Sequence, residues 1–151
     1  MRVFASICAL LAVLWSAPMS LAQGEAYVPG LGDIMTTIQM RHIKLWFAGK
    51  LENWDLADYE LSQIRQSLED AATLYSGIPV EYVGATADPI KAIDVAIKAN
   101  DGAKFTKGYA ALTTACNACH QGIGRGFISI QVPSASPFTD QSFAPPKKMT
   151  G

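Results

Sequence analysis

Two cysteines and a histidine near the end of the sequence form its most specific pattern. Cys116 and Cys119 are separated by two residues and His120 follows directly, in the segment CNACH. C-x-x-C-H is the signature of c-type haem attachment, in which each thiol adds to one porphyrin vinyl group and the imidazole ligates the iron. On a helix, the i, i+3 and i+4 spacing places all three side chains on one face. The pattern predicts one covalent haem c, with Cys116 and Cys119 as its thioethers and His120 as the proximal iron ligand.

Two other kinds of site use closely spaced cysteines. A zinc site would require two further Cys or His ligands at suitable spacing, and the only other histidine is His42. A thioredoxin-like redox pair would place C-x-x-C after a strand, at the start of a helix. Here the motif lies at the expected end of a helix, so haem attachment is the favoured interpretation.

The first residues have the pattern of a secretory signal peptide. Met1 and Arg2 give a short positive start, residues 3–15 are apolar, and small residues lead up to Ala22. We expect cleavage after Ala22, which removes Cys8 with the peptide. A membrane anchor is the alternative, but the apolar run is short for a bilayer span. The sequence thus predicts export to the periplasm, an environment in which haem c attachment is expected.

Charge and length limit the classes of partner. The 151 residues carry a formal net charge of −1, and loss of Arg2 with the signal peptide changes this to −2. So small a charge favours neither nucleic acid nor an anionic membrane as a partner. We expect one domain at residues 23–126 and an extended tail at residues 127–151.

Apolar periodicity predicts four helices in that domain. The repeats and their flanking residues indicate helices at about 31–48, 53–75, 88–99 and 103–121, with Gly49 ending the first and residues 76–87 forming a loop. Four amphipathic helices with short connections predict an all-α fold, an antiparallel four-helix bundle with an irregular C-terminal extension. In the tail, Ile128, Ile130 and Val132 alternate with polar residues, but several prolines favour an extended cover over a sheet. This cover would lie over the haem edge or over the end of the bundle.

A haem motif at the end of the last helix of an exported four-helix bundle resembles the class II cytochromes c, cytochrome c prime and its low-spin relatives. The resemblance covers residues 31–122, and its one specific motif is CNACH. It implies that haem lies between the helices and that the first helix supplies the distal side. The family's first-helix pattern, a Met followed by a helical run into a Gly-Lys turn, matches Met35 through Gly49 and Lys50. Relatives of this kind often dimerise through helix faces, so a homodimer is allowed.

Three occupants of the distal iron position stay open. Met35 is level with the end of the last helix if the first and last helices run antiparallel, whereas His42 lies about 10 Å further along the axis. Met40 lies off the apolar stripe. We therefore expect Met35 as the distal ligand, with His42 or an empty position as alternatives. The choice matters because a thioether raises the reduction potential and a second imidazole lowers it.

Other side chains are candidates for contact with the porphyrin. Phe105, Tyr109 and Phe127 are expected to pack on it, and Trp46 and Trp54 to pack at the bundle end. The class II family often has an Arg four residues before the Met, where this sequence has Leu31. The candidate partners of a haem propionate are therefore other cations: Arg41, Lys44 and Arg125.

The pattern as a whole predicts a periplasmic electron-transfer cytochrome rather than an enzyme. Both axial ligands would stay bound while single electrons pass to and from redox partner proteins. The alternative is a five-coordinate haem protein that binds NO or CO, as cytochrome c prime does. A small peroxidase is a third hypothesis, and only His42 could supply its distal acid–base group.

Overall fold

The computed structural model describes residues 27–147, and the predicted signal peptide at residues 1–22 lies outside them. The described chain contains helices and irregular segments and no strand, which confirms the all-α prediction. The helices are α2 (Leu31–Lys50), α3 (Trp54–Leu74), α4 (Val80–Gly84), α5 (Ala87–Lys98) and α6 (Gly102–Gly122). Among these residues, no helix is both long and apolar enough to cross a membrane.

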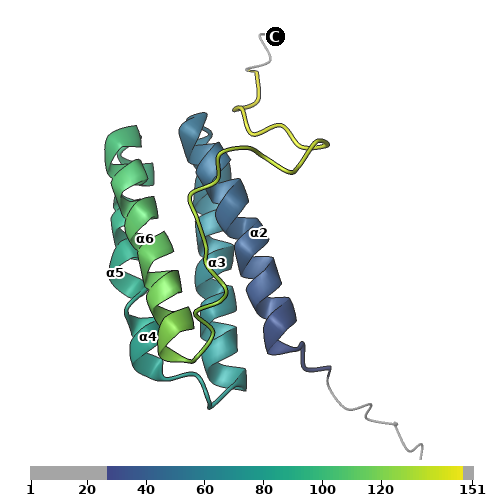
Figure 1. Ribbon diagram of the computed structural model, residues 1–151. Helices are drawn as coiled ribbons and strands as arrows, with labels where there is room; N and C mark the ends of the chain where they lie inside the picture. Colours follow the sequence, from purple (N-terminus) through teal and green to yellow (C-terminus); the bar gives the residue numbers. More distant parts are fainter. Residues whose placement is uncertain (1–26, 148–151) are drawn as a thin grey trace, which may run out of the picture.

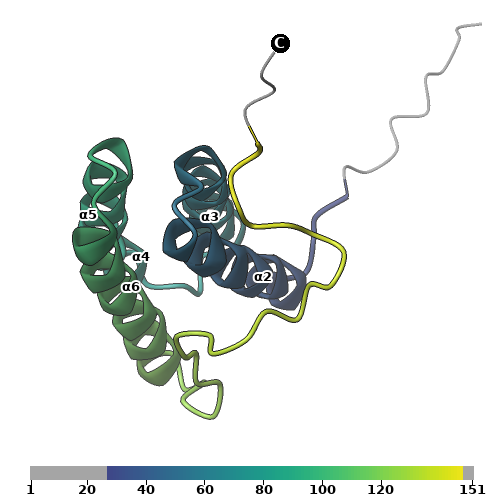
Figure 2. The ribbon, with the colours of Figure 1, turned by 90° about the horizontal axis from the view of Figure 1, so that it is seen from above.

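The four long helices form two helical hairpins, which Figure 1 shows from the side and Figure 2 from above. Helix α2 packs chiefly on α3, and α5 chiefly on α6, whereas contacts between the hairpins are fewer and join α3 to α5 and α2 to α6. Asparagine and aspartate caps fix where two of these helices begin. Asn53 accepts a hydrogen bond from the Leu56 amide, and Asp101 accepts one from the Lys104 amide.

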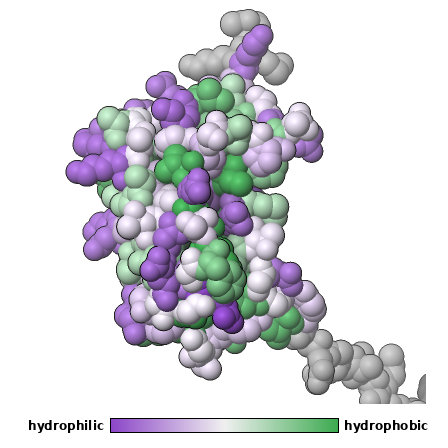
Figure 3. All heavy atoms as spheres, viewed as in Figure 1, coloured by the Kyte–Doolittle hydropathy of each residue, from purple (hydrophilic) through white to green (hydrophobic). Residues whose placement is uncertain are grey.

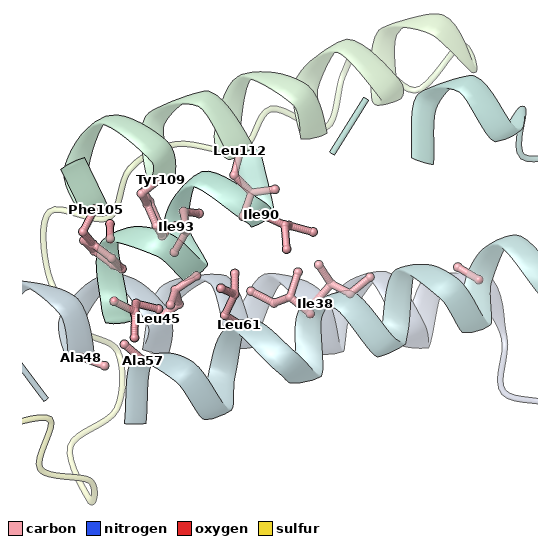
Figure 4. Packing of buried hydrophobic residues seen from close by; sticks show 14 of the residues in the cluster. Ile38, Leu45, Ala48, Ala57, Leu61, Ile90, Ile93, Phe105, Tyr109 and Leu112 are labelled. Atoms are coloured by element: carbon pink, nitrogen blue, oxygen red, sulfur yellow. The ribbon is translucent and has the colours of Figure 1, made fainter. Parts of the chain in front are cut away.

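The core lies between the hairpins and is densest where the chain turns from α2 to α3 and from α5 to α6. In Figure 4, side chains of α5 and α6 point toward those of α2 and α3. Phe105, Tyr109 and Leu112 of α6 are fully buried, as are Leu45 of α2 and Ala57 of α3. Trp46 and Trp54 flank Phe105 with ring centroids 6.4 and 6.0 Å away, as expected for packing at this end.

Two features of the helices differ from the sequence prediction. Gly49 does not end α2, which continues to Lys50. Gly49 is buried because the Phe105 ring lies directly against it, so that a Cβ atom there would overlap the ring. In addition, the expected loop at residues 76–87 contains the short helix α4, whose five residues are too few to show a periodicity.

The tail after α6 is irregular and crosses from α6 to the α2–α3 hairpin (Figures 1 and 2). Its far part is held by Phe143, which is 6% exposed and packs against Phe47 of α2, and by the Asn53 side chain, which donates a hydrogen bond to the Ala144 carbonyl. On the face seen in Figure 3, apolar side chains gather along the middle of the molecule, with hydrophilic side chains around them. Residues 127–147 contain no strand, in keeping with the prolines that disfavour a sheet there.

Candidate functional site

A cavity of about 540 Å³ opens between the hairpins. It lies toward the opposite end of the helices from the packed rings of Phe105, Trp46 and Trp54. This volume is within the range of small-molecule and cofactor sites. Large side chains fill the space between the hairpins around Phe105. After Leu112, the side chains that line this space are smaller: Cys116 and Cys119 of α6 and Ala71 of α3. The cavity is lined by residues of α2, α3, α4, α6 and the tail, together with Ile78 and Thr86 from the connections on either side of α4: Leu31, Gly32, Met35, Thr36, Ile38, Gln39, His42, Leu68, Ala71, Ile78, Tyr82, Val83, Thr86, Cys116, Cys119, His120, Ile123, Arg125, Ile128 and Ile130.

All three predicted motif side chains line this cavity from the last turns of α6. Cys116 and Cys119 are free, partly buried thiols. Burial, with a smaller effect from Cys119, raises the pKa of the Cys116 thiol to about 11, and burial also raises the pKa of Cys119. Both groups are therefore protonated thiols at neutral pH rather than thiolates.

The tail fixes the orientation of the His120 ring. His120 Nδ1 lies 2.9 Å from the carbonyl oxygen of Ile128. A carbonyl only accepts hydrogen bonds, so Nδ1 carries the proton, which in the neutral form of the ring leaves the lone pair on Nε2. This tautomer is the one that a histidine needs to ligate a metal through Nε2.

Asn117, inside the motif, binds the tail at two points. Its Nδ2 donates to the Ile130 carbonyl and its Oδ1 accepts from the Ile130 amide, each at 2.8 Å. Ile128 and Ile130 both line the cavity, so the tail closes one side of it. Asn117, Ile128 and Ile130 were not among the predicted site residues, although the alternation of the two isoleucines was visible in the sequence.

Met35 of α2 lines the same cavity as the motif, and it is half-buried. Met40, expected to lie off the stripe, is 44% exposed and does not line the cavity. The structure thus brings the predicted distal methionine and the predicted proximal histidine to the same cavity.

His42 also lines the cavity, but both of its ring nitrogens are hydrogen-bonded. Nε2 is 2.9 Å from the Thr113 hydroxyl, and Nδ1 is 2.8 Å from the Tyr109 hydroxyl. The His42 and Tyr109 rings stack with their centroids 4.4 Å apart. Burial lowers the pKa of His42 to about 4, so the ring is neutral at pH 7. In this arrangement His42 offers no free nitrogen to a metal or a substrate.

The three aromatic residues expected to pack on a porphyrin are not brought to the cavity. Phe105 and Tyr109 are buried in the core, where Phe105 lies against Gly49 and Tyr109 against His42. Phe127 is 80% exposed on the turn after α6. Phe105 and Tyr109 share a stripe with Cys116, but at 1.5 Å per residue they lie about 16 and 10 Å from it along the axis. An aromatic residue that does line the cavity, Tyr82, was not predicted.

Of the three candidate cations, only Arg125 lines the cavity. Arg41 instead forms an ion pair with the buried Glu60 at 3.0 Å, at the contact between α2 and α3. Lys44 lies over the Phe138 ring of the tail, 4.8 Å from its centroid. An anionic group at this site would therefore find its positive partner in Arg125.

The geometry also bears on the other uses of paired cysteines. No three His, Cys, Asp or Glu side chains within residues 27–147 converge as a metal-ion cluster requires. Reactive C-x-x-C pairs have a cysteine with a lowered pKa, whereas burial here raises the pKa of Cys116 and Cys119. The arrangement favours chemistry that begins from neutral thiols.

A second hollow, of about 430 Å³, lies between α3, α4 and α5. Charged side chains on its rim include Arg65, Glu69, Lys91 and Asp94, and it contains no Cys or His. The two cysteines, His42 and His120 all line the cavity between the hairpins instead.

Comparison with known proteins adds no assignment, because no family model, curated protein or solved structure matches this chain significantly. The interpretation of the site depends on its own residues and geometry.

Proposed function

We propose that this chain is an exported monohaem c-type cytochrome that transfers single electrons. One observation carries the proposal: two neutral thiols, a histidine with its lone pair on Nε2, and a methionine thioether all line one cavity. Each of these groups matches a requirement of a six-coordinate haem c site.

The residues present fit such a group. The cavity has a suitable volume, and its walls are mainly apolar, with Ile38, Leu68 and Ile78 among them. Cys116 and Cys119 would each form one C–S bond as the S–H adds across a vinyl group. His120 and Met35 would ligate the iron, which supplies a centre that accepts and releases one electron. The chain itself fixes the His120 ring, keeps water from the apolar walls, and offers Arg125 to a carboxylate.

The edge of the cavity explains how electrons would reach the site. Gly32, Thr36 and Gln39 line the cavity and are exposed, as is Arg125. The cavity therefore opens at the protein surface near the start of α2. A redox protein that docks there would approach the cofactor closely without any rearrangement of the core.

The proposed assembly and location follow from the same features. The two hairpins, with helices joined by short turns, support an antiparallel four-helix bundle of the class II cytochrome c type. Residues 1–22 support export to the periplasm, where a cleaved signal peptide would leave the chain beginning near Gln23. The resemblance to the class II family then extends to the placement of the haem between helices.

Two measurements test the proposal. The full chain is produced with its own signal segment in a bacterium that attaches haem c, and the periplasmic protein is stained for haem on a denaturing gel. We expect covalent haem in the wild type and its loss in Cys116→Ser/Cys119→Ser. A wild-type protein that folds in the periplasm without covalent haem refutes the proposal.

The distal ligand is tested separately by carbon monoxide. We expect a low-spin wild-type spectrum that CO does not change, and rapid CO binding in Met35→Ala because its coordination position is open. Met40→Ala is the matched control, since Met40 is on the same helix but outside the cavity. A low-spin Met35→Ala protein that resists CO would exclude Met35 as the ligand.

Gas binding is the second candidate function, and the distal wall favours it. The α2 and α3 residues that line the cavity around Met35 carry no charge, and both ring nitrogens of His42 are hydrogen-bonded to Thr113 and Tyr109. An uncharged wall of this kind would admit NO or CO if Met35 stayed off the iron. Rapid CO binding by the wild type would favour this function over electron transfer.

A further inference from the structure

Two neighbouring hydrogen bonds join the motif to the tail. Asn117 and His120 are three residues apart on α6, so their side chains point to one face of the helix. Ile128 and Ile130 are two residues apart in the tail, and the carbonyls of both lie within hydrogen-bond distance of side chains of α6. The Ile130 carbonyl accepts from Asn117 at 2.8 Å, and the Ile128 carbonyl accepts from His120 at 2.9 Å.

We propose that Asn117 is a positioning residue for His120, acting through the tail segment 128–130 that it holds. The inference rests on the proposed function, in which His120 Nε2 ligates iron. Asn117 binds both backbone polar groups of Ile130, which fixes the position and the rotation of this residue. The Ile128 carbonyl is thereby aimed at His120 Nδ1.

Two backbone hydrogen bonds also lead to this segment, from the Arg125 amide to the His120 carbonyl at 2.6 Å and from the Ile128 amide to the Arg125 carbonyl at 2.8 Å. The connection after α6 contains Gly124 and Gly126, and Gly124 has a positive φ of 71°. Phe127 is 80% exposed and Ile128 is 42% exposed, so little apolar burial fixes this part of the tail. The buried anchor, Phe143, lies thirteen positions beyond Ile130 in the sequence. The backbone bond fixes the amide side of Ile128, and Asn117 is the side chain of α6 that restrains the chain on the carbonyl side, toward Ile130.

The consequence for the site is electronic as well as geometric. A histidine that donates Nδ1–H to a carbonyl is held in one orientation and is a stronger electron donor through Nε2. A stronger donor stabilises ferric iron and lowers the reduction potential. Loosening segment 128–130 should therefore raise the potential, even though Asn117 touches neither the iron nor the porphyrin in this scheme.

The test compares the same substitution at the two asparagines that bind the tail. In Asn117→Ser, the short hydroxyl cannot span both polar groups of Ile130. In the control, Asn53→Ser, the hydroxyl still caps α3 but loses the bond to the Ala144 carbonyl, far from the motif. Both changes are uncharged and remove an amide that binds tail backbone.

Hydrogen exchange and the reduction potential are measured on the purified full-length proteins. We expect the Ile130 amide to exchange about tenfold faster in Asn117→Ser, since a well-made hydrogen bond contributes about 1.4 kcal/mol. We also expect a higher potential in this variant, with both quantities at wild-type values in Asn53→Ser. Unchanged exchange at Ile130 would show that Asn117 does not hold the segment. Faster exchange with an unchanged potential would show that Asn117 holds the tail but does not position His120.

Failure of the proposed function gives a different result. Wild-type protein without covalent haem refutes the cytochrome proposal, and the ¹⁵N shifts of His120 then replace the potential as the second measurement. In that case, positioning by Asn117 predicts that Nε2 is unprotonated in the wild type and that Asn117→Ser mixes the two tautomers. Identical His120 shifts in both proteins would overturn the inference.

Discussion

The buried His42 makes the stability of this fold dependent on pH. Its ring is 3% exposed and lies between the Tyr109 and Thr113 hydroxyls, one on each ring nitrogen. Burial lowers its pKa from 6.5 to about 4. Between these two values the unfolded chain binds a proton on His42 that the folded chain does not bind. Stability from this group is thus complete above pH 6.5 and falls as the pH is lowered toward 4.

The size of the loss follows from the size of the shift. One pKa unit corresponds to about 1.4 kcal/mol, so a shift from 6.5 to about 4 gives a loss of about 3 kcal/mol between pH 7 and pH 4. A domain of this size has a total stability of about 5–15 kcal/mol, so the effect is large enough to measure.

Urea unfolding at half-unit steps from pH 7 to pH 4 measures this effect, with His42→Gln as the reference protein. Glutamine keeps hydrogen-bonding groups for Tyr109 and Thr113 but does not titrate. Carboxylates contribute equally in both proteins, so the difference between the two stability curves isolates His42. We expect His42→Gln to lose about 3 kcal/mol less than the wild type over this range.

Parallel curves for the two proteins would refute the reasoning. They would mean that His42 accepts a proton in the folded state at its ordinary pKa, and hence that the ring is not buried between the two hydroxyls. A wild-type protein that gains stability relative to His42→Gln on acidification would reverse the sign and exclude a neutral buried ring.

Three further predictions concern the framework of the site. Gly49→Ala should destabilise the fold by about 2 kcal/mol in urea unfolding, because the new methyl group meets the Phe105 ring; unchanged stability would place that ring elsewhere. Arg41→Met should cost about 3 kcal/mol at pH 7 because it leaves the Glu60 carboxylate, 1% exposed, without its partner. A loss similar to that of an exposed ion pair would contradict this burial. Phe143→Ala should release the end of the tail, seen as faster limited proteolysis after residue 131, while α2–α6 resist cleavage as in the wild type.

The sequence was sufficient for the long helices, whose apolar stripes extend over many turns. It could not distinguish a glycine that ends a helix from one that admits a neighbouring ring. Gly49 follows the last apolar residues of α2, where a terminal glycine is common, and only the approach of Phe105 explains it. Helix α4 was missed for a different reason, since five residues are too few to show an apolar period.

The candidate site shows the same limit at the level of side chains. The local spacing of Cys116, Cys119 and His120 predicted a shared face, and the level of Met35 followed from the expected direction of the helices. The partners of His42, in contrast, lie 67 and 71 residues away in the sequence, and no local pattern connects them. The apolar repeat in the sequence of α6 is the same along the helix. It could not show that the first turns of the helix enter the core while its last turns line the cavity.

The path of the tail couples the two hairpins mechanically. The tail is hydrogen-bonded to α6 through Asn117 and to the α2–α3 hairpin through Asn53. The partner of Asn53 in the tail, Ala144, lies 91 residues later in the sequence. Opening the cavity by moving one hairpin away from the other would have to break one of these attachments. The tail thus links two hairpins that share limited contact, and we expect them to unfold together as one cooperative unit.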